Sequence, residues 1–96
     1  MLRHVVTIKF DGSVSPAQRS EIAASLLALG DDIADVQSLE FGMDVSNEEH
    51  SSDAVLIVDL ADDAAYRRYE AHPAHIAATK LIGPALAGSS VLRYER

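Results

Sequence analysis

The sequence has no cysteine and no tryptophan, and its only aromatic residues are three tyrosines and two phenylalanines. Without cysteine, the protein can form no disulfide, no thiolate nucleophile and no cysteine-ligated zinc site. With so few aromatic side chains, the core is predicted to consist mainly of Leu, Ile, Val and Ala. Because 48% of the residues are hydrophobic, the composition indicates a folded globule rather than a disordered chain.

Positive charge is also scarce, with eight Lys and Arg against fifteen Asp and Glu, for a net charge of -7. Nucleic acids and anionic membrane surfaces attract clustered Lys and Arg, whereas the only adjacent pair here is Arg67-Arg68. We therefore expect no nucleic-acid partner and no membrane partner. No apolar run approaches a membrane span, and the N-terminus lacks the apolar region of a signal peptide, so a cytoplasmic location is expected.

The length and the hydrophobic pattern predict one small domain over residues 1–96. Alternating or continuous apolar residues indicate four strands, at residues 2–10, 36–45, 54–60 and 89–95. In the first of these, His4 lies on the apolar face. In the second, Gly42 interrupts the pattern, which indicates a bulge or the close approach of another chain.

A first helix is predicted between the first two strands. Ser15 suits the N-cap, Pro16 suits the first helical position, and Gln18 completes a capping box. Apolar residues then recur with helical spacing until Gly30, which is expected to end the helix.

A second helical region follows the third strand and is expected to be broken. A proline disfavours helical geometry in the residue before it, so the helix should end near His72. A second segment, residues 74–82, is expected to start with Pro73 as its first residue and His72 as its cap.

The predicted order β-α-β-β-α-β indicates a ferredoxin-like α+β fold, with helices on one face of an antiparallel sheet. The opposite sheet face would lack a cover within one chain, yet apolar residues are expected there too: Val5, Val55, Ile57 and Val91. An exposed apolar face indicates a partner, and we expect a homodimer formed through the sheet faces.

Reactive side chains gather in the segment 69–75, Tyr-Glu-Ala-His-Pro-Ala-His. A neutral histidine can accept a proton from carbon, so His75 is the candidate general base, and Tyr69 is the candidate donor to a developing enolate. His4 and His72 are candidate ligand-binding residues, although both could be purely structural, and so could His75 and Tyr69. Because Pro73 interrupts the His-x-x-His spacing, we expect no metal site there. We also expect no cofactor.

The chain resembles the stress-responsive dimeric α/β-barrel (Dabb) family over essentially its whole length. The resemblance depends on three strand motifs and above all on segment 69–75; the strand motifs are residues 4–10, 41–46 and 56–60. It implies a homodimer of ferredoxin-like protomers whose sheets enclose a dimeric α/β barrel. The broader superfamily includes cofactor-free monooxygenases.

The resemblance also implies roles for individual residues. In one plant branch, which cyclises linear polyketides by aldol condensation, histidine at the position of His75 is the base, tyrosine at that of Tyr69 assists, and histidine at that of His4 lines the pocket. A further pocket histidine, expected near residues 53–54, is absent, and Asp44 replaces a frequent asparagine.

Two functions therefore remain open. The first is a homodimeric stress-responsive protein that binds a small hydrophobic ligand in a pocket lined by His4, Tyr69 and His75. The second is a cofactor-independent enzyme, with polyketide cyclase-like chemistry favoured over monooxygenase chemistry, in which His75 is the general base.

Overall fold

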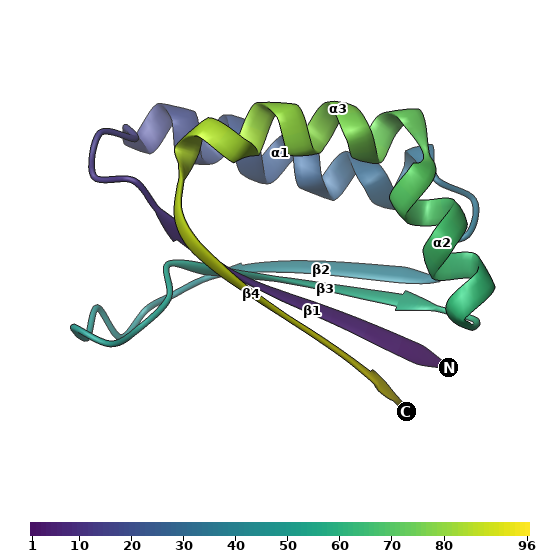
Figure 1. Ribbon diagram of the computed structural model, residues 1–96. Coiled ribbons are helices and arrows are strands. Elements are labelled where there is room, and N and C mark those ends of the chain that lie inside the picture. Colours follow the sequence, from purple (N-terminus) through teal and green to yellow (C-terminus); the bar gives the residue numbers. More distant parts are fainter.

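A computed structural model describes all 96 residues as one four-stranded antiparallel sheet covered on one face by helices (Figure 1). The elements are β1 (Leu2–Phe10), α1 (Pro16–Asp32), β2 (Ser38–Met43), β3 (Ala54–Leu60), α2 (Asp63–Ala71), α3 (Pro73–Ile82), a 3-10 turn (Gly83–Ala85) and β4 (Leu86–Glu95). The strand order β2-β3-β1-β4 is that of a ferredoxin-like fold, so the predicted α+β fold class is confirmed.

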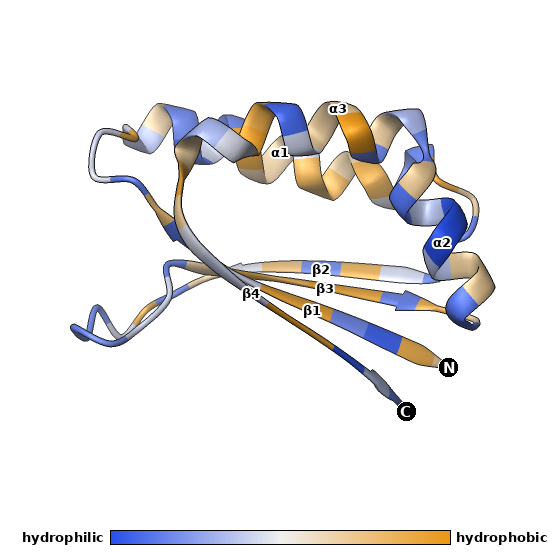
Figure 2. Ribbon diagram, viewed as in Figure 1, coloured by the Kyte–Doolittle hydropathy of each residue, from blue (hydrophilic) through white to orange (hydrophobic).

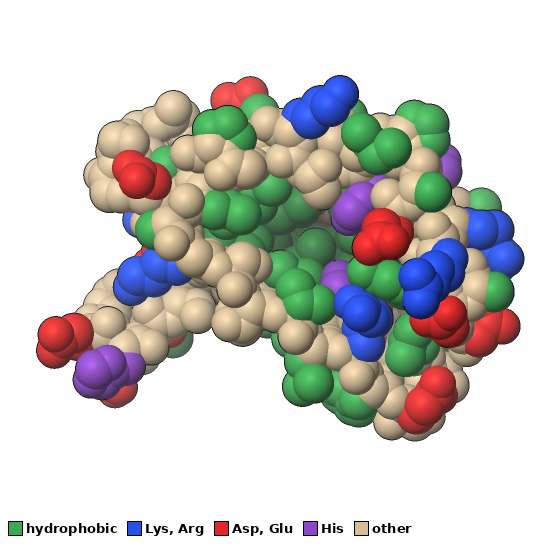
Figure 3. All heavy atoms as spheres, viewed as in Figure 1, with side chains coloured by type: hydrophobic (Ala, Val, Ile, Leu, Met, Phe, Trp, Pro, Cys, Tyr) green, Lys and Arg blue, Asp and Glu red, His purple; other side chains and the backbone are tan.

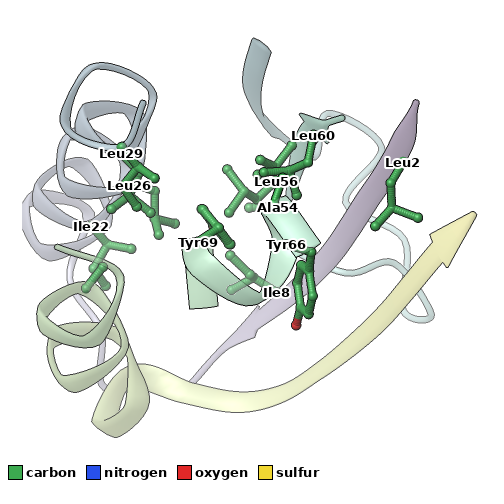
Figure 4. Packing of buried hydrophobic residues seen from close by; sticks show 14 of the residues in the cluster. Leu2, Ile8, Ile22, Leu26, Leu29, Ala54, Leu56, Leu60, Tyr66 and Tyr69 are labelled. Atoms are coloured by element: carbon green, nitrogen blue, oxygen red, sulfur yellow. The ribbon is translucent and has the colours of Figure 1, made fainter. Parts of the chain in front are cut away.

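The core lies between the sheet and the helices, as expected from the alternation of β1. Its largest fully buried side chains include Ile8, Leu29 and Val58. Figure 4 shows the apolar side chains of α1 pointing toward those of β3. Hydrophobic colouring runs along the middle of β1 and β3 and along α1 and α3 (Figure 2). The predicted aliphatic core is therefore present, and it positions the helices over the sheet.

Helix α1 begins as predicted but ends later. Gln18 donates its backbone N–H to Oγ of Ser15 (3.1 Å), and Ser15 donates its own to Oε1 of Gln18 (2.7 Å), which is the expected capping box. The helix does not stop at Gly30 but continues to Asp32, because Ile33 beyond it is buried in the core at 1% exposure. A Cβ on Gly30 would lie 3.5 Å from Cβ of Leu39, which is an ordinary van der Waals distance, so the packing of α1 on β2 leaves room for a methyl group here.

Strand β2 is shorter than predicted and has no bulge. Its six residues pair in unbroken register with β3, so the interpretation of Gly42 as a bulge is wrong. The chain leaves the sheet after Met43, where the Asp44 carboxylate accepts hydrogen bonds from the Ser46 hydroxyl and the Asn47 backbone N–H. Val45, predicted to be in the strand, is 92% exposed.

The face of the sheet opposite the helices is partly apolar, with one correction to the predicted residues. Val91 pairs with Val6 and lies on the helix-facing side, whereas Leu92 pairs with Val5 and lies on the outer face. Val5 in turn pairs with Ile57, so these three apolar side chains form a row across the outer face. Leu92 is 62% exposed in the protomer.

A buried ion pair lies beside this apolar row on the outer face. The Arg3 guanidinium donates to both carboxylate oxygens of Asp59 at 2.8 and 2.9 Å, and the Ser38 hydroxyl donates to the same carboxylate at 2.8 Å. Asp59 is only 4% exposed. The hydrogen bonds from Arg3, followed by the bond from Ser38, hold the pKa of Asp59 at about 2, below its ordinary value of 3.8.

This ion pair predicts a loss of stability in acid. A carboxylate with a folded pKa below its unfolded pKa stabilises the fold above the unfolded value, so this stability is lost as the pH falls from about 4 to about 2. We expect Asp59→Asn to lower the free energy of unfolding by about 2 kcal/mol at pH 7 and to flatten its dependence on pH below 4.

Urea unfolding at a series of pH values measures both effects. Asp63→Asn is the matched control, because it removes only an exposed pair with Arg67, which is worth less than about 1 kcal/mol. An Asp59→Asn variant with the wild-type acid profile would contradict the prediction.

Candidate ligand-binding cavity

A cavity of about 550 Å³ lies between the helix-facing side of the sheet and the helices. Figure 3 shows it as a hollow with hydrophobic side chains inside and with histidine, acidic and basic side chains gathered at one rim. Eleven of its 18 lining residues are hydrophobic, and they come from both layers; examples are Val6 and Leu56 from the sheet and Leu26 and Ile82 from the helices. The volume is within the range of about 300–1,000 Å³ that is typical of small-molecule sites.

One end of the cavity is polar. The titratable residues that line it are His4, Tyr66, Tyr69, Glu70, His75 and Arg93. The ring centroids of Tyr69 and His75 are 4.7 Å apart, and those of His4 and Tyr69 are 6.2 Å apart. The structure thus brings together three residues, His4, Tyr69 and His75, that the sequence singles out from distant positions.

The break between α2 and α3 orients His75. In a continuous helix, the N–H of Ala74 would bond to the carbonyl of Glu70. Here the chain turns at Pro73, the N–H of Ala74 donates to Nδ1 of His72, and the Glu70 carbonyl lies 3.0 Å from Nδ1 of His75. Because a carbonyl can only accept, Nδ1 of His75 carries the proton, and Nε2 keeps its lone pair with no protein partner.

His72 has a different position from the other candidates. Its Nδ1 accepts a hydrogen bond of 3.0 Å from the N–H of Ala74, which makes it the N-cap of α3 as predicted. It does not line the cavity. The geometry therefore gives His72 a structural position and lends no support to its predicted role as a ligand-binding residue.

His4 is a buried histidine with an unsatisfied ring nitrogen. It is 5% exposed, and its Nδ1 is enclosed without any hydrogen-bond partner. Burial, then the positive charge of Arg93, lowers the pKa of His4 to about 4. The ring is therefore neutral near pH 7 and can serve a ligand as donor or acceptor.

Tyr69 presents a protonated hydroxyl. Its side chain is 1% exposed, and burial raises the pKa of Tyr69 to about 12. The hydroxyl makes no hydrogen bond to a protein group, and it is not enclosed as Nδ1 of His4 is, so it is open to the cavity. It can donate its proton to an oxygen atom of a ligand.

The sequence interpretation missed three residues of the polar end. Tyr66 donates its hydroxyl proton to Oε2 of Glu70 (3.0 Å) and accepts a hydrogen bond from Nη1 of Arg93 (3.1 Å). The helical spacing of Tyr66, Tyr69 and Glu70 places them on one face of α2 and is a signal that could have found the first and the last. Arg93 is brought in by pairing with His4 across β1 and β4, which its own segment does not reveal.

Three other features bear on metal and membrane sites. No three or more histidine or acidic side chains are placed to hold a metal ion. His50 is exposed in the loop between β2 and β3. No helix has both the length and the apolar character that crossing a membrane requires.

Solved structures share this fold over nearly the full chain. A dimeric ferredoxin-like protein of unknown function from Thermobifida fusca is 26% identical, with a TM-score of 0.91 over 99% of this chain and 90% of that one. An Arabidopsis thaliana protein is 24% identical, with a TM-score of 0.90 over 100% and 95%. A hydroxynitrile lyase from Passiflora edulis is 18% identical, with a TM-score of 0.88 over 97% and 90%.

The last two likenesses show the fold alone, because their identities are low. No curated protein matches the sequence. The model of the stress-responsive A/B barrel domain matches residues 2–95, and this match agrees with the resemblance carried by segment 69–75. The chain belongs to the stress-responsive A/B barrel (Dabb) family.

Proposed function

We propose that the protein is a homodimer that binds a small, largely apolar ligand in this cavity, with the ligand's polar end at His4, Tyr69 and His75. The observation that carries the proposal is a hollow of about 550 Å³ with apolar walls and unpaired polar groups at one end. A buried polar atom without a partner costs about 1–3 kcal/mol, and a ligand that supplies the partner recovers this cost.

The outer sheet face supports the homodimer. Val5, Ile57 and Leu92 form an apolar row that no part of the protomer covers. The similar protein from Thermobifida fusca is described as dimeric. Two such faces packed together would remove the row from water in both protomers and would leave the helix-facing cavities open.

A second candidate function is cofactor-independent catalysis, and the fixed tautomer of His75 favours it. With Nδ1–H donated to the Glu70 carbonyl, Nε2 can take the proton from an acidic carbon between two carbonyl groups. The carbon keeps the electron pair as an enolate, and the Tyr69 hydroxyl can donate a hydrogen bond to its oxygen. The enolate carbon can then attack a second carbonyl carbon, as in an aldol addition. The C=O π electrons move to that oxygen, and the resulting alkoxide takes back the proton from Nε2 of His75, which restores the base.

Partly filling the cavity is expected to weaken ligand binding. Thr79 of α3 lines the cavity and is exposed. We expect Thr79→Phe to weaken the binding of octanamide, a neutral apolar probe with one polar end, by at least about tenfold, which is a loss of about 1.4 kcal/mol. Isothermal titration calorimetry measures the affinity.

The control for this test is Ala77→Phe, which adds the same ring to an exposed position of α3 outside the cavity. This variant should bind octanamide with wild-type affinity. Equal weakening by both substitutions would indicate a general effect on α3, and unchanged binding in Thr79→Phe would place the probe elsewhere.

A further inference from the structure

The polar end of the cavity contains one side chain that carries a full positive charge, that of Arg93. Four of the other five arginines form an ion pair with a carboxylate within 4.0 Å: Arg3, Arg67, Arg68 and Arg96. Arg93 forms no such pair, although a carboxylate, that of Glu70, lines the same cavity. Its guanidinium lies 4.3 Å from the centre of the Tyr66 ring and donates one hydrogen bond, from Nη1 to the Tyr66 hydroxyl.

The contacts with Tyr66 orient the Arg93 guanidinium but occupy few of its hydrogen-bond donors. A guanidinium has five N–H donors in a planar fork, and only one of them has a protein acceptor here. The Glu70 carboxylate is occupied by the Tyr66 hydroxyl at 3.0 Å, so Tyr66 stands between the two charges and accepts from one while donating to the other. The unused donors of Arg93 are therefore available to an acceptor from outside the protein.

The neighbouring groups also suit an anion. His4 is directly opposite Arg93 in the pairing of β1 with β4, and it is 95% buried with Nδ1 unpartnered. At His4, the positive charge of Arg93 affects the pKa more strongly than the negative charge of Glu70 does. The protonated hydroxyl of Tyr69 lines the same end, has no acceptor within the protein, and can donate to an acceptor that a ligand brings.

We propose that the ligand of this cavity carries a carboxylate, bound by the free donors of Arg93 at the polar end while its apolar body lies between the sheet and the helices. The inference deepens the proposed function and rests on it. Arginine binds carboxylates with two parallel hydrogen bonds, which matches the unused fork. Arg93 is the one arginine or lysine at this end, and the Glu70 carboxylate there already carries a negative charge, so the single charge of a carboxylate meets less repulsion than a phosphate dianion would in a chain of net charge -7.

The test compares octanoate with octanamide, which has the same chain and a neutral end, by isothermal titration calorimetry at pH 7.5. The wild-type protein should bind octanoate at least about tenfold more tightly, a difference of about 1.4 kcal/mol. Arg93→Gln should reduce this ratio to near one by weakening octanoate far more than octanamide. Arg93→Lys, which keeps the charge but not the fork, should give an intermediate ratio.

The control variant is Arg67→Gln, which removes one positive charge from α2 outside the cavity and should keep the wild-type ratio. Equal affinity of the wild-type protein for both probes would overturn the proposal that the ligand carries a carboxylate, while the proposal of an apolar ligand cavity would remain. This comparison uses only the wild-type protein, so it does not depend on the folding of any variant. Tighter binding of octyl phosphate than of octanoate would overturn the choice of anion. Binding of neither octanoate nor octanamide would remove the proposed function and this inference with it.

Discussion

Leu92→Glu is expected to convert the proposed homodimer into monomers. Leu92 is 62% exposed in the protomer and ends the apolar row that continues through Val5 and Ile57 on the outer sheet face. A glutamate there would place a carboxylate in each half of the interface, close to its symmetry mate or to apolar side chains. We expect the dissociation constant to rise at least about 100-fold, or about 2.7 kcal/mol. Sedimentation velocity at micromolar concentrations measures the change.

The matched control is Leu27→Glu. Leu27 is a leucine of comparable exposure, 49%, but it lies on α1, on the opposite layer of the protomer. This variant should remain dimeric. A wild-type protein that sediments as a monomer, or a Leu92→Glu variant that stays dimeric, would contradict association through the sheet faces. Dissociation caused by Leu27→Glu would instead place the contact on the helical layer.

The proposed dimer would account for the satisfied ion pair that lies beside the apolar row on the outer face. Asp59 has its carboxylate bonded by Arg3 and Ser38 inside one protomer, so it brings no unpaired charge into an interface. A buried ion pair adds little net stability compared with apolar packing, but removing one partner is costly. The hydrogen bonds of Asp59 would therefore allow a partner to cover the outer sheet face without burying an unpaired charge.

Local rules were sufficient where one short-range interaction decides the structure. The capping box of Ser15 and Gln18 sets the start of α1, and Pro73 sets the break between α2 and α3, both as the sequence predicts. The alternation of residues 2–10 places His4 on the buried side, because a period of two leaves no other choice for Leu2, Ile8 and Phe10.

Tertiary packing overrode local rules at two places. Gly30 costs a helix about 1 kcal/mol, but burying Ile33 gains more than that, so α1 continues past the glycine. In β4, Val91 and Leu92 are adjacent and both apolar, so alternation cannot tell which faces the helices. Pairing with β1 decides it, since Val91 stands opposite Val6.

The residues of the candidate site also differ in whether local sequence or tertiary structure identifies them. His75 and Tyr69 were found because they are close together in the sequence around a proline. Arg93 lies 89 positions from His4 in sequence, and only the antiparallel pairing of the two termini brings them together. The sequence of residues 89–95 alone could not predict that Arg93 lies at the cavity, because nothing in that segment relates it to His4.

His75→Ala is expected to abolish catalysed proton exchange if the cavity performs base chemistry. A suitable probe is ethyl 3-oxooctanoate, which has an apolar chain and an acidic carbon between two carbonyl groups. In D₂O, the wild-type protein should accelerate exchange at that carbon, and loss of a general base should reduce the acceleration by about 100-fold or more. Proton NMR follows the disappearance of the signal, and added octanamide should inhibit the exchange by occupying the cavity.

Two further variants test whether His75 acts as a general base or only supports the structure. His75→Asn places an amide N–H near the position of the ring Nδ1, which lies 3.0 Å from the Glu70 carbonyl, and so keeps this donor but has no basic nitrogen. It should bind octanamide with near wild-type affinity and still fail to accelerate exchange, because the lone pair of Nε2 is what accepts the proton. His50→Ala, in an exposed loop, should retain full acceleration. Full acceleration by His75→Asn, or none by the wild-type protein, would leave the cavity as a binding site without base chemistry.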